Sequence, residues 1–363
     1  MKRLGIFFFY ENGDVDDFIT YYLRDLARNL TELIVVCNGK LSKQGRAAFE
    51  EFTDQIIVRE NKGLDVWAYK TALDHYGWQR LSEFDEVVMT NSTLMGPVRP
   101  LKEMFDAMAE RTNLDFWGLT IHHGAEGNPF KGKHLYNYLP VHIQSHFIVY
   151  RKKFIQSKEL QNYWDTMPMI ESYTDSVQRY ESVFTKQFAD KGYQWDVYVN
   201  TDDLKEFTDY PLLVCPTRLL RDKKCPLFKR RSFMHDFEAY LNDTAGEPVR
   251  ELYAYLRDHT DYPLELIWKN MIRTMHPYDF TRNLGLTRLI PERYRMRPAP
   301  LPCAKTAALR CACTCILWIC CPKAAPLPPT CRRRLTFLFP PTRRRKSSRS
   351  KKRSAPCRCM PLP

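Results

Sequence analysis

The stretch FDEVVMTNSTLMGP, residues 84–97, places an apolar run directly before three small polar residues and a Gly-Pro turn. The run, Val87-Val88-Met89, predicts a short buried strand. Residues 91–93 (Asn-Ser-Thr) close that strand with neutral oxygens and no carboxylate. Two interpretations of this end of the strand are therefore open: a ligand site and an ordinary turn.

The order of a strand followed by a helix repeats along the chain. Apolar runs occupy residues 4–10, 30–39, 54–61 and 84–93, and segments with helical spacing follow at 15–30, 42–52, 65–78 and 100–111. This alternation predicts an α/β fold with a mainly parallel sheet flanked by helices. The strands are almost continuously apolar, as expected of a sheet covered on both faces. Further strands are expected at 115–120, 143–154 and 196–199, with helices between 157 and 195.

Polar residues follow each of the four early strands, at 10–14, 38–39, 60–65 and 91–93. Because ligands of such sheets bind beyond the carboxyl ends of the strands, these clusters predict one site at one edge. Polar strand ends are also common without a ligand, so the alternative of ordinary turns stays open. The sequence has no G-x-G-x-x-G, P-loop or G-x-S-x-G motif, which argues against a dinucleotide oxidoreductase.

The basic charge of the chain belongs to its last segment. The net charge is +13 over 363 residues, but residues 297–363 hold 16 Lys and Arg with no Asp or Glu, which leaves −3 for the rest. The folded part is therefore not expected to bind nucleic acid. We expect three parts: residues 1–210 as the α/β domain, 211–296 as a helical extension and 297–363 as a tail.

Residues 297–363 are rich in Pro, Cys and Arg, and hold nine of the 12 cysteines. A disordered basic tail fits this composition. A coding sequence that is read in a shifted frame from this point explains the abrupt change of composition better. The stretch CACTCILWICCP (311–322) does not fit a zinc site, because it lacks paired C-x-x-C knuckles and a nearby His. The three earlier cysteines are scattered, which favours a reducing, cytoplasmic location.

Many stretches together carry a resemblance to a known family. KRLGIFFFY, LIVVCNGKLS, IIVRENKGLDVWAYKTAL, FDEVVMTNSTLMGP, KGYQWDVYV and KCPLFKRRSF, in this order, resemble the rhamnan synthesis protein F family of polysaccharide rhamnosyltransferases. The resemblance covers about residues 2–296. It implies a GT-A-like glycosyltransferase fold. It also implies inverting transfer from dTDP-β-L-rhamnose to a lipid-linked polysaccharide, with peripheral contact at the inner face of the plasma membrane.

The resemblance also implies roles for particular residues. By analogy with the GT-A pattern, Tyr10, Glu60, Asn61 and Asp65 would hold the nucleoside of the donor. The catalytic base comes from a helix that ends in a Gly-aromatic turn, and RYESVFTKQFADKGYQW has that form, with Glu181 11 residues before Gly192. A positioned carboxylate is needed because the acceptor hydroxyl must lose its proton as it attacks. Asp175 and Asp196 are the alternatives to Glu181.

The diphosphate is expected near residues 91–93. Many nucleotide-sugar enzymes hold a divalent metal with aspartates at this place. Asn91 and Thr93 offer neutral oxygens only, so a Mg²⁺ or Mn²⁺ ion would bind weakly there, and metal-independent transfer is equally open. The candidate cations for the diphosphate are Lys62, Lys70, Arg151 and the run Lys229-Arg230-Arg231, the last of which also reads as solvated surface. An inactive glycan- or nucleotide-binding module, or a truncated fragment, is the alternative function.

Overall fold

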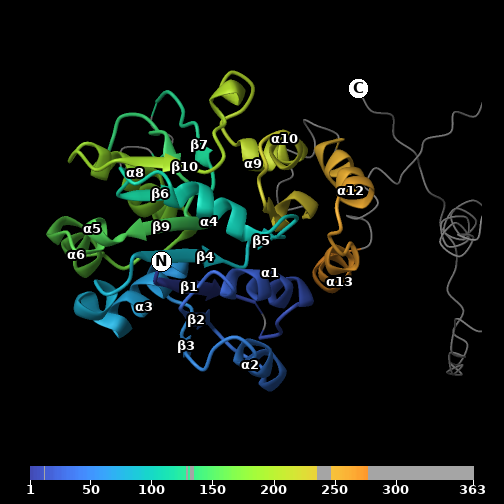
Figure 1. Cartoon of the computed structure of the whole chain (residues 1–363), viewed down its shortest axis with the longest axis horizontal. Helices are drawn as coiled ribbons and strands as arrows, with labels where there is room; N and C mark the ends of the chain where they lie inside the picture. Colours follow the sequence, from blue (N-terminus) through green and yellow to red (C-terminus); the bar gives the residue numbers. More distant parts are fainter. Residues whose placement is uncertain (12, 128–129, 131–134, 235–246, 277–363) are drawn as a thin grey trace, which may run out of the picture. The chain divides into compact units, whose positions relative to one another are not determined.

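A seven-stranded sheet lies at the centre of the computed structural model, which describes residues 1–11, 13–127, 130, 135–234 and 247–276. Its strand order is β10-β6-β9-β4-β1-β2-β3 (Figure 1). The strands are β1 (Arg3–Phe9), β2 (Glu32–Asn38), β3 (Ile56–Arg59), β4 (Glu86–Asn91), β6 (Phe116–Gly118), β9 (Phe147–Arg151) and β10 (Trp195–Val197). Only β9 runs antiparallel to its neighbours, so the prediction of a mainly parallel α/β sheet is confirmed.

Helices cover both faces of this sheet. They are α1 (Asp17–Ala27), α2 (Lys43–Glu50), α3 (Leu64–Leu81), α4 (Leu101–Ala109), α5 (Lys152–Ile155), α6 (Lys158–Asp165), α7 (Tyr173–Ser176), α8 (Ser182–Ala189), α9 (Pro211–Val214), α10 (Pro216–Asp222), α12 (Glu247–His259) and α13 (Glu265–Thr274). Shorter helical turns are the π-helix η1 (Val177–Glu181) and the 3₁₀ helices η2 (Asp202–Leu204) and η3 (Arg230–Phe233).

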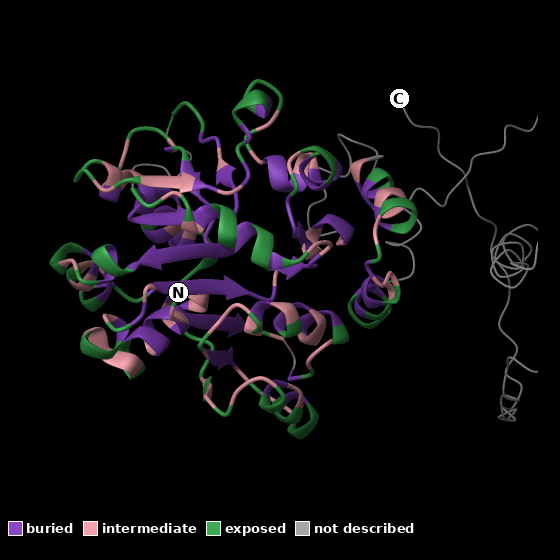
Figure 2. Ribbon diagram, in the orientation of Figure 1, coloured by how far each residue is buried: buried purple, intermediate pink, exposed green. Residues whose placement is uncertain are grey.

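The alternation of side chains along β1 divides the core into two layers. Phe7 and Phe9 pack into a cluster with residues of α1, α4, α10, α12 and α13. Ile6 and Phe8 point to the opposite face and join residues of α3, α6 and α8. The central strands are buried along their whole length (Figure 2). Burial on both faces explains why these strands read as continuous apolar runs rather than alternating ones.

Two small sheets stand beside the central one. In the first, β5 (Leu94–Met95) pairs antiparallel with β11 (Phe228–Lys229), so Lys229 lies opposite Leu94. In the second, β7 (Ile121–His122) pairs with β8 (His142–Ile143). These pairings bring chain segments that are distant in sequence to the region that follows β4 and β6.

The C-terminal helices of the described chain attach to the loop after β1. Arg273 of α13 donates two hydrogen bonds to the Asp16 carboxylate, at 2.8 and 2.6 Å, and Asn270 donates a third at 2.6 Å. The expected tail, 297–363, and the end of the expected helical extension lie outside the described residues. Within those residues, no helix combines the length and apolar character that a membrane crossing requires.

Candidate active site

The carboxyl ends of β1, β2 and β3 lie side by side, as the parallel order requires. Asn38, the last residue of β2, donates to Asn61 Oδ1 at 3.1 Å and to the Leu64 carbonyl at 2.9 Å, and accepts from Arg59 at 2.8 Å. The ring of Tyr10 lies close to Gly39, 3.9 Å from where a Cβ would stand. The structure therefore brings the predicted donor residues Tyr10 and Asn61 to one edge.

The Asn-Ser-Thr stretch forms a hydrogen-bonded turn between β4 and β5. Asn91 Oδ1 accepts from the Thr93 N–H at 3.1 Å and from the Thr93 hydroxyl at 2.6 Å. Such side-chain turns are typical of Asn because its short amide reaches the backbone two residues on. The turn directs the chain into β5, which pairs with β11.

That pairing places Lys229 at the turn. Its Nζ donates to Thr93 Oγ1 at 3.2 Å, and the next residue, Arg230, donates its backbone N–H to the Thr93 carbonyl at 3.0 Å. Lys229 is only 8% exposed. Burial lowers the pKa of its ammonium to about 8, although the charges of Glu181 and Asp65 act in the opposite direction. The side chain of Arg230 instead pairs with Glu11 at the end of β1.

Glu181 ends the π-helical turn η1, between α7 and α8. Its Oε2 accepts from both the backbone N–H of Ser145, at 3.1 Å, and the Ser145 hydroxyl. Its Oε1 lies 3.9 Å from His142 Nε2. The side chain is 24% exposed, so one carboxylate oxygen is fixed while the group stays within reach of solvent. Single π-helical turns occur frequently at functional sites.

Asp65, at the start of α3, lies near Glu181. Burial raises the pKa of Asp65 to about 6, and the charge of Glu181 raises it further, while hydrogen bonds from Val66 and Ser176 lower it. The Ser176 hydroxyl is 3.3 Å from Asp65 Oδ1. The charges of Asp65 and Glu181 also raise the pKa of Lys229, so the three groups lie near one another. We call them the carboxylate–lysine cluster.

Aromatic and basic side chains surround this cluster. Burial raises the pKa of Tyr173 and Tyr210, and the Glu181 charge raises both further. The Arg231 guanidinium lowers the pKa of the same two phenols, so it too lies in this region. Tyr173 is 69% exposed and Tyr210 is partly buried, so these rings offer a surface on which a sugar could stack.

Histidines line the side of the site next to Glu181. The rings of His122 and His142 stack with centroids 5.1 Å apart, and His142 Nδ1 is 2.7 Å from the Pro140 carbonyl. Burial lowers the pKa of His122 to about 4, and the neighbouring His142 lowers it further. His146 is buried, and its Nε2 has no hydrogen-bond partner among the described residues. Both burial and the charge of Lys229 lower the pKa of His146.

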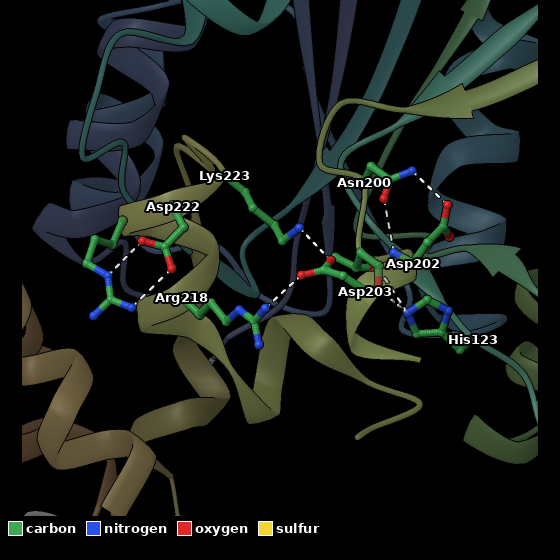
Figure 3. Close-up of polar contacts among 9 residues, drawn as sticks. His123, Asn200, Asp202, Asp203, Arg218, Asp222 and Lys223 are labelled. Carbon is green, nitrogen blue, oxygen red and sulfur yellow. Dashed lines mark hydrogen bonds and ion pairs between the residues drawn. The ribbon is translucent and has the colours of Figure 1, made fainter. Parts of the chain in front are cut away.

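The loop after β10 is fixed by charged contacts, which Figure 3 shows. Asp203 accepts from Arg218 at 2.8 Å and from Lys223 at 2.6 Å, which ties the loop to α10. His123 Nε2 lies 2.9 Å from the Thr201 carbonyl at the other side of the loop. These contacts hold the chain that leads to Tyr210 and then to β11.

Other predicted residues lie away from the carboxylate–lysine cluster. Arg151 ends the antiparallel β9, so it lies at the opposite edge of the sheet, where it donates to the carbonyls of Arg111 and Met108. Glu60 and Lys62 are exposed after β3 and pair with each other at 2.8 Å. Lys70 pairs with Asp74 along α3.

The two alternative bases already have cationic partners. Asp175 lies 3.1 Å from Arg179 Nε, and Asp196 lies 2.8 Å from Arg111 Nη1. Glu181 has hydroxyl, amide and imidazole neighbours instead. Sequence reasoning did not single out Ser145, because a lone Ser gives no pattern and its partner lies 36 residues further on.

The residues at the β4 turn do not fit a divalent metal. Within the described ranges, no group of three or more His, Cys, Asp or Glu side chains could hold one. Both lone pairs of Asn91 Oδ1 are engaged by Thr93, and Thr93 Oγ1 accepts from the Lys229 ammonium. A Mg²⁺ ion, which prefers anionic oxygens, would meet a positive charge here.

Comparison with known proteins gives one family. The model described as Rhamnan synthesis protein F matches residues 33–300. No curated protein matches the chain in sequence. Similar solved structures include CMP:2-keto-3-deoxy-manno-octonic acid synthetase complexed with CTP (13% identity, 62% of this chain, 100% of that chain, TM-score 0.32). A cytidylyltransferase from Leptospira borgpetersenii serovar Hardjo-bovis is 12% identical, with 72% of this chain and 100% of that chain covered and a TM-score of 0.33.

A third similar structure is glucosyl-3-phosphoglycerate synthase from Mycobacterium tuberculosis in complex with Mg²⁺ and uridine-diphosphate. It is 12% identical, with 54% of this chain and 69% of that chain covered and a TM-score of 0.33. Likenesses as distant as these three do not bear on function.

Proposed function

The chain belongs to the rhamnan synthesis protein F family, and from this premise we propose that it transfers a sugar from a nucleotide sugar to a growing polysaccharide. The donor is dTDP-L-rhamnose, and the acceptor is a lipid-linked glycan at the cytoplasmic face of the membrane. One observation supports the proposal above the others. The edge that gathers Tyr10, Asn61 and Asn91 also carries Glu181, whose carboxylate stands in a cluster with Asp65 and Lys229.

The nucleoside lies over the ends of β1 to β3. Tyr10 is 51% exposed beside Gly39 and offers a ring face to the base. Asn61 is held by Asn38 and presents its amide at the same edge. Asp65 supplies a carboxylate for sugar hydroxyls of the donor. In this arrangement the diphosphate lies toward the β4 turn and the transferred sugar lies between the turn and Glu181.

Transfer proceeds by one displacement with inversion. Glu181 removes the proton of the acceptor hydroxyl through Oε1, while Ser145 holds Oε2. The hydroxyl oxygen bonds to the anomeric carbon as the bond from that carbon to the diphosphate oxygen breaks. The electron pair leaves with the diphosphate, and positive charge near the turn stabilises it. General-base assistance of this kind contributes about 10²–10⁴-fold to a rate.

The direct test is release of nucleoside diphosphate by the purified full chain. The protein is incubated with dTDP-L-rhamnose, and separately with dTDP-glucose and UDP-glucose, each with and without a rhamnan oligosaccharide acceptor. We expect acceptor-dependent release of dTDP from dTDP-L-rhamnose above the other two donors. Binding of the donor without release under any acceptor would instead identify a binding module. Equal release from all three donors would remove the rhamnose assignment.

A further inference from the structure

The β4 turn, where a nucleotide-sugar enzyme commonly holds a metal, is built around an ammonium group instead. Lys229 Nζ is 3.2 Å from Thr93 Oγ1, and the Thr93 hydroxyl in turn donates to Asn91 Oδ1 at 2.6 Å. The Thr93 N–H also donates to Asn91 Oδ1, so this oxygen has no lone pair left for a cation. The three side chains form a chain of donors and acceptors that ends at the ammonium.

The backbone fixes Lys229 in this position. β11 pairs with β5 immediately after the turn, and the N–H of Arg230 donates to the Thr93 carbonyl at 3.0 Å. The two ends of the contact are 136 residues apart, so the pairing of β5 with β11 is what brings the cation to the turn. The side chain of the neighbouring Arg230 pairs with Glu11, whereas the ammonium of Lys229 contacts Thr93.

The surroundings of Lys229 favour an anion. It is 8% exposed, and among the residues that the structure describes its ammonium donates to a neutral hydroxyl, that of Thr93. A buried ammonium without a contacting counterion is costly, and an arriving phosphate oxygen removes that cost. Burial lowers the pKa of Lys229 to about 8, which agrees with a cation that lacks a full counterion. Asp65 and Glu181 are close enough to favour its charged form but are held by the hydroxyls of Ser176 and Ser145.

We propose that the ammonium of Lys229 takes the place of the divalent metal and holds the diphosphate of the donor, so that binding and transfer need no metal ion. The inference rests on the proposed function. In the transfer step the electron pair of the broken bond goes to the diphosphate oxygen, and Lys229 stabilises the charge that develops there. The proton of the acceptor hydroxyl goes to Glu181, so Lys229 stays protonated throughout.

Calorimetric titration of the full chain with dTDP tests this, in EDTA and separately with Mg²⁺ or Mn²⁺. We expect wild-type protein to bind dTDP equally well in all three buffers. Lys229→Met is expected to weaken dTDP binding by about 10–100-fold, since a hydrogen bond to a charged group contributes that much. Thymidine, which lacks phosphates, is expected to bind both proteins alike. Lys229→Arg keeps the charge and retains binding in EDTA, and Lys205→Met, on an exposed side chain, is the matched control.

The outcomes separate the two proposals. Binding and transfer that appear only with a metal overturn the role of Lys229 and leave the transferase proposal standing. Failure of the wild type to bind any nucleotide or nucleotide sugar in every buffer overturns the transferase proposal itself. If Lys229→Met does not fold, the wild type in EDTA decides. Folded Lys229→Met that binds dTDP in EDTA as tightly as the wild type also overturns the role of Lys229.

Discussion

Buried charges lie at both edges of the central sheet, and their partners differ. At the amino edge of β4, Glu86 contacts Arg3 Nε at 2.6 Å and lies 3.3 Å from Arg151 Nε, and Trp117 donates to it at 3.2 Å. At the carboxyl edge, the ammonium of Lys229 and the carboxylates of Asp65 and Glu181 contact hydroxyl groups, and Glu181 also lies 3.9 Å from His142. These hydroxyls belong to Thr93, Ser176 and Ser145.

The two edges therefore differ in how their buried charges are compensated. Removal of one member of a buried ion pair leaves its partner buried and uncompensated, so the amino edge contributes to stability. At the carboxyl edge the pKa values of Asp65 and Lys229 are shifted, which is a mark of functional sites. Four substitutions, from the largest expected effect to the smallest, test this difference between the two edges.

Glu181→Gln is expected to give the largest effect. The amide keeps the shape of the side chain but cannot accept the acceptor proton, so transfer should fall by about 10²–10⁴-fold. The affinity for dTDP-L-rhamnose should stay the same. Initial rates of dTDP release and calorimetric titration measure the two quantities. Glu206→Gln, on an exposed side chain outside the site, is the control. Full activity of Glu181→Gln would remove it from the role of base.

Glu86→Gln is expected to act on folding and not on chemistry. It leaves Arg3 and Arg151 without their shared carboxylate, so the free energy of unfolding should fall by about 3–5 kcal/mol. Urea unfolding followed by circular dichroism measures this. Transfer per folded molecule, assayed well below the melting temperature, should equal that of the wild type. A loss of activity without a loss of stability would place the functional site at the amino edge of the sheet and contradict this account.

Asp65 is expected to set the acid limb of the pH profile. Its carboxyl has a pKa raised to about 6, so it is protonated below that pH and ionised above it. The value of kcat/KM should therefore rise with pH through about 6, and be about 10-fold lower one unit below this pKa. Asp65→Asn should lower the plateau and remove this limb. If the acid limb of the pH profile is unchanged in Asp65→Asn, another titratable group is responsible for it.

Asp222→Asn is expected to give the smallest effect. Asp222 pairs with Arg221 at 2.8 and 3.0 Å, but both side chains are about half exposed. Exposed pairs contribute little because water screens them and ordering two side chains costs entropy. The midpoint of urea unfolding should not move measurably, and transfer should be unaffected. A measurable change would show that exposed pairs here matter as much as the buried ones around Glu86.

The secondary structure could be predicted from the sequence where the elements are long and their apolar residues are periodic. The strands at 4–10, 30–39 and 84–93 and the helix at 15–30 correspond to β1, β2, β4 and α1. Strands of two residues, such as β5 and β11, have too few positions to show a period. The pairing of those two strands was therefore not predicted, although it is what brings Lys229 to the turn.

The candidate site followed from the sequence only in part. The convergence of Tyr10, Asn61 and Asn91 follows from parallel strand order alone. Arg151 was predicted as a cation for the diphosphate, but the direction of β9 cannot be read from composition, and the antiparallel strand carries Arg151 to the amino edge. The contact of Ser145 with Glu181 depends on tertiary packing, which a single sequence does not reveal.

A crystal structure of the full chain with dTDP, grown in EDTA, tests the central claim most directly. The account predicts a diphosphate oxygen within hydrogen-bonding distance of Lys229 Nζ, with the nucleoside over the strand ends at Tyr10 and Asn61. A nucleotide bound beside Arg151 at the amino edge, or one that enters the turn only with a metal ion on Asn91, would contradict it.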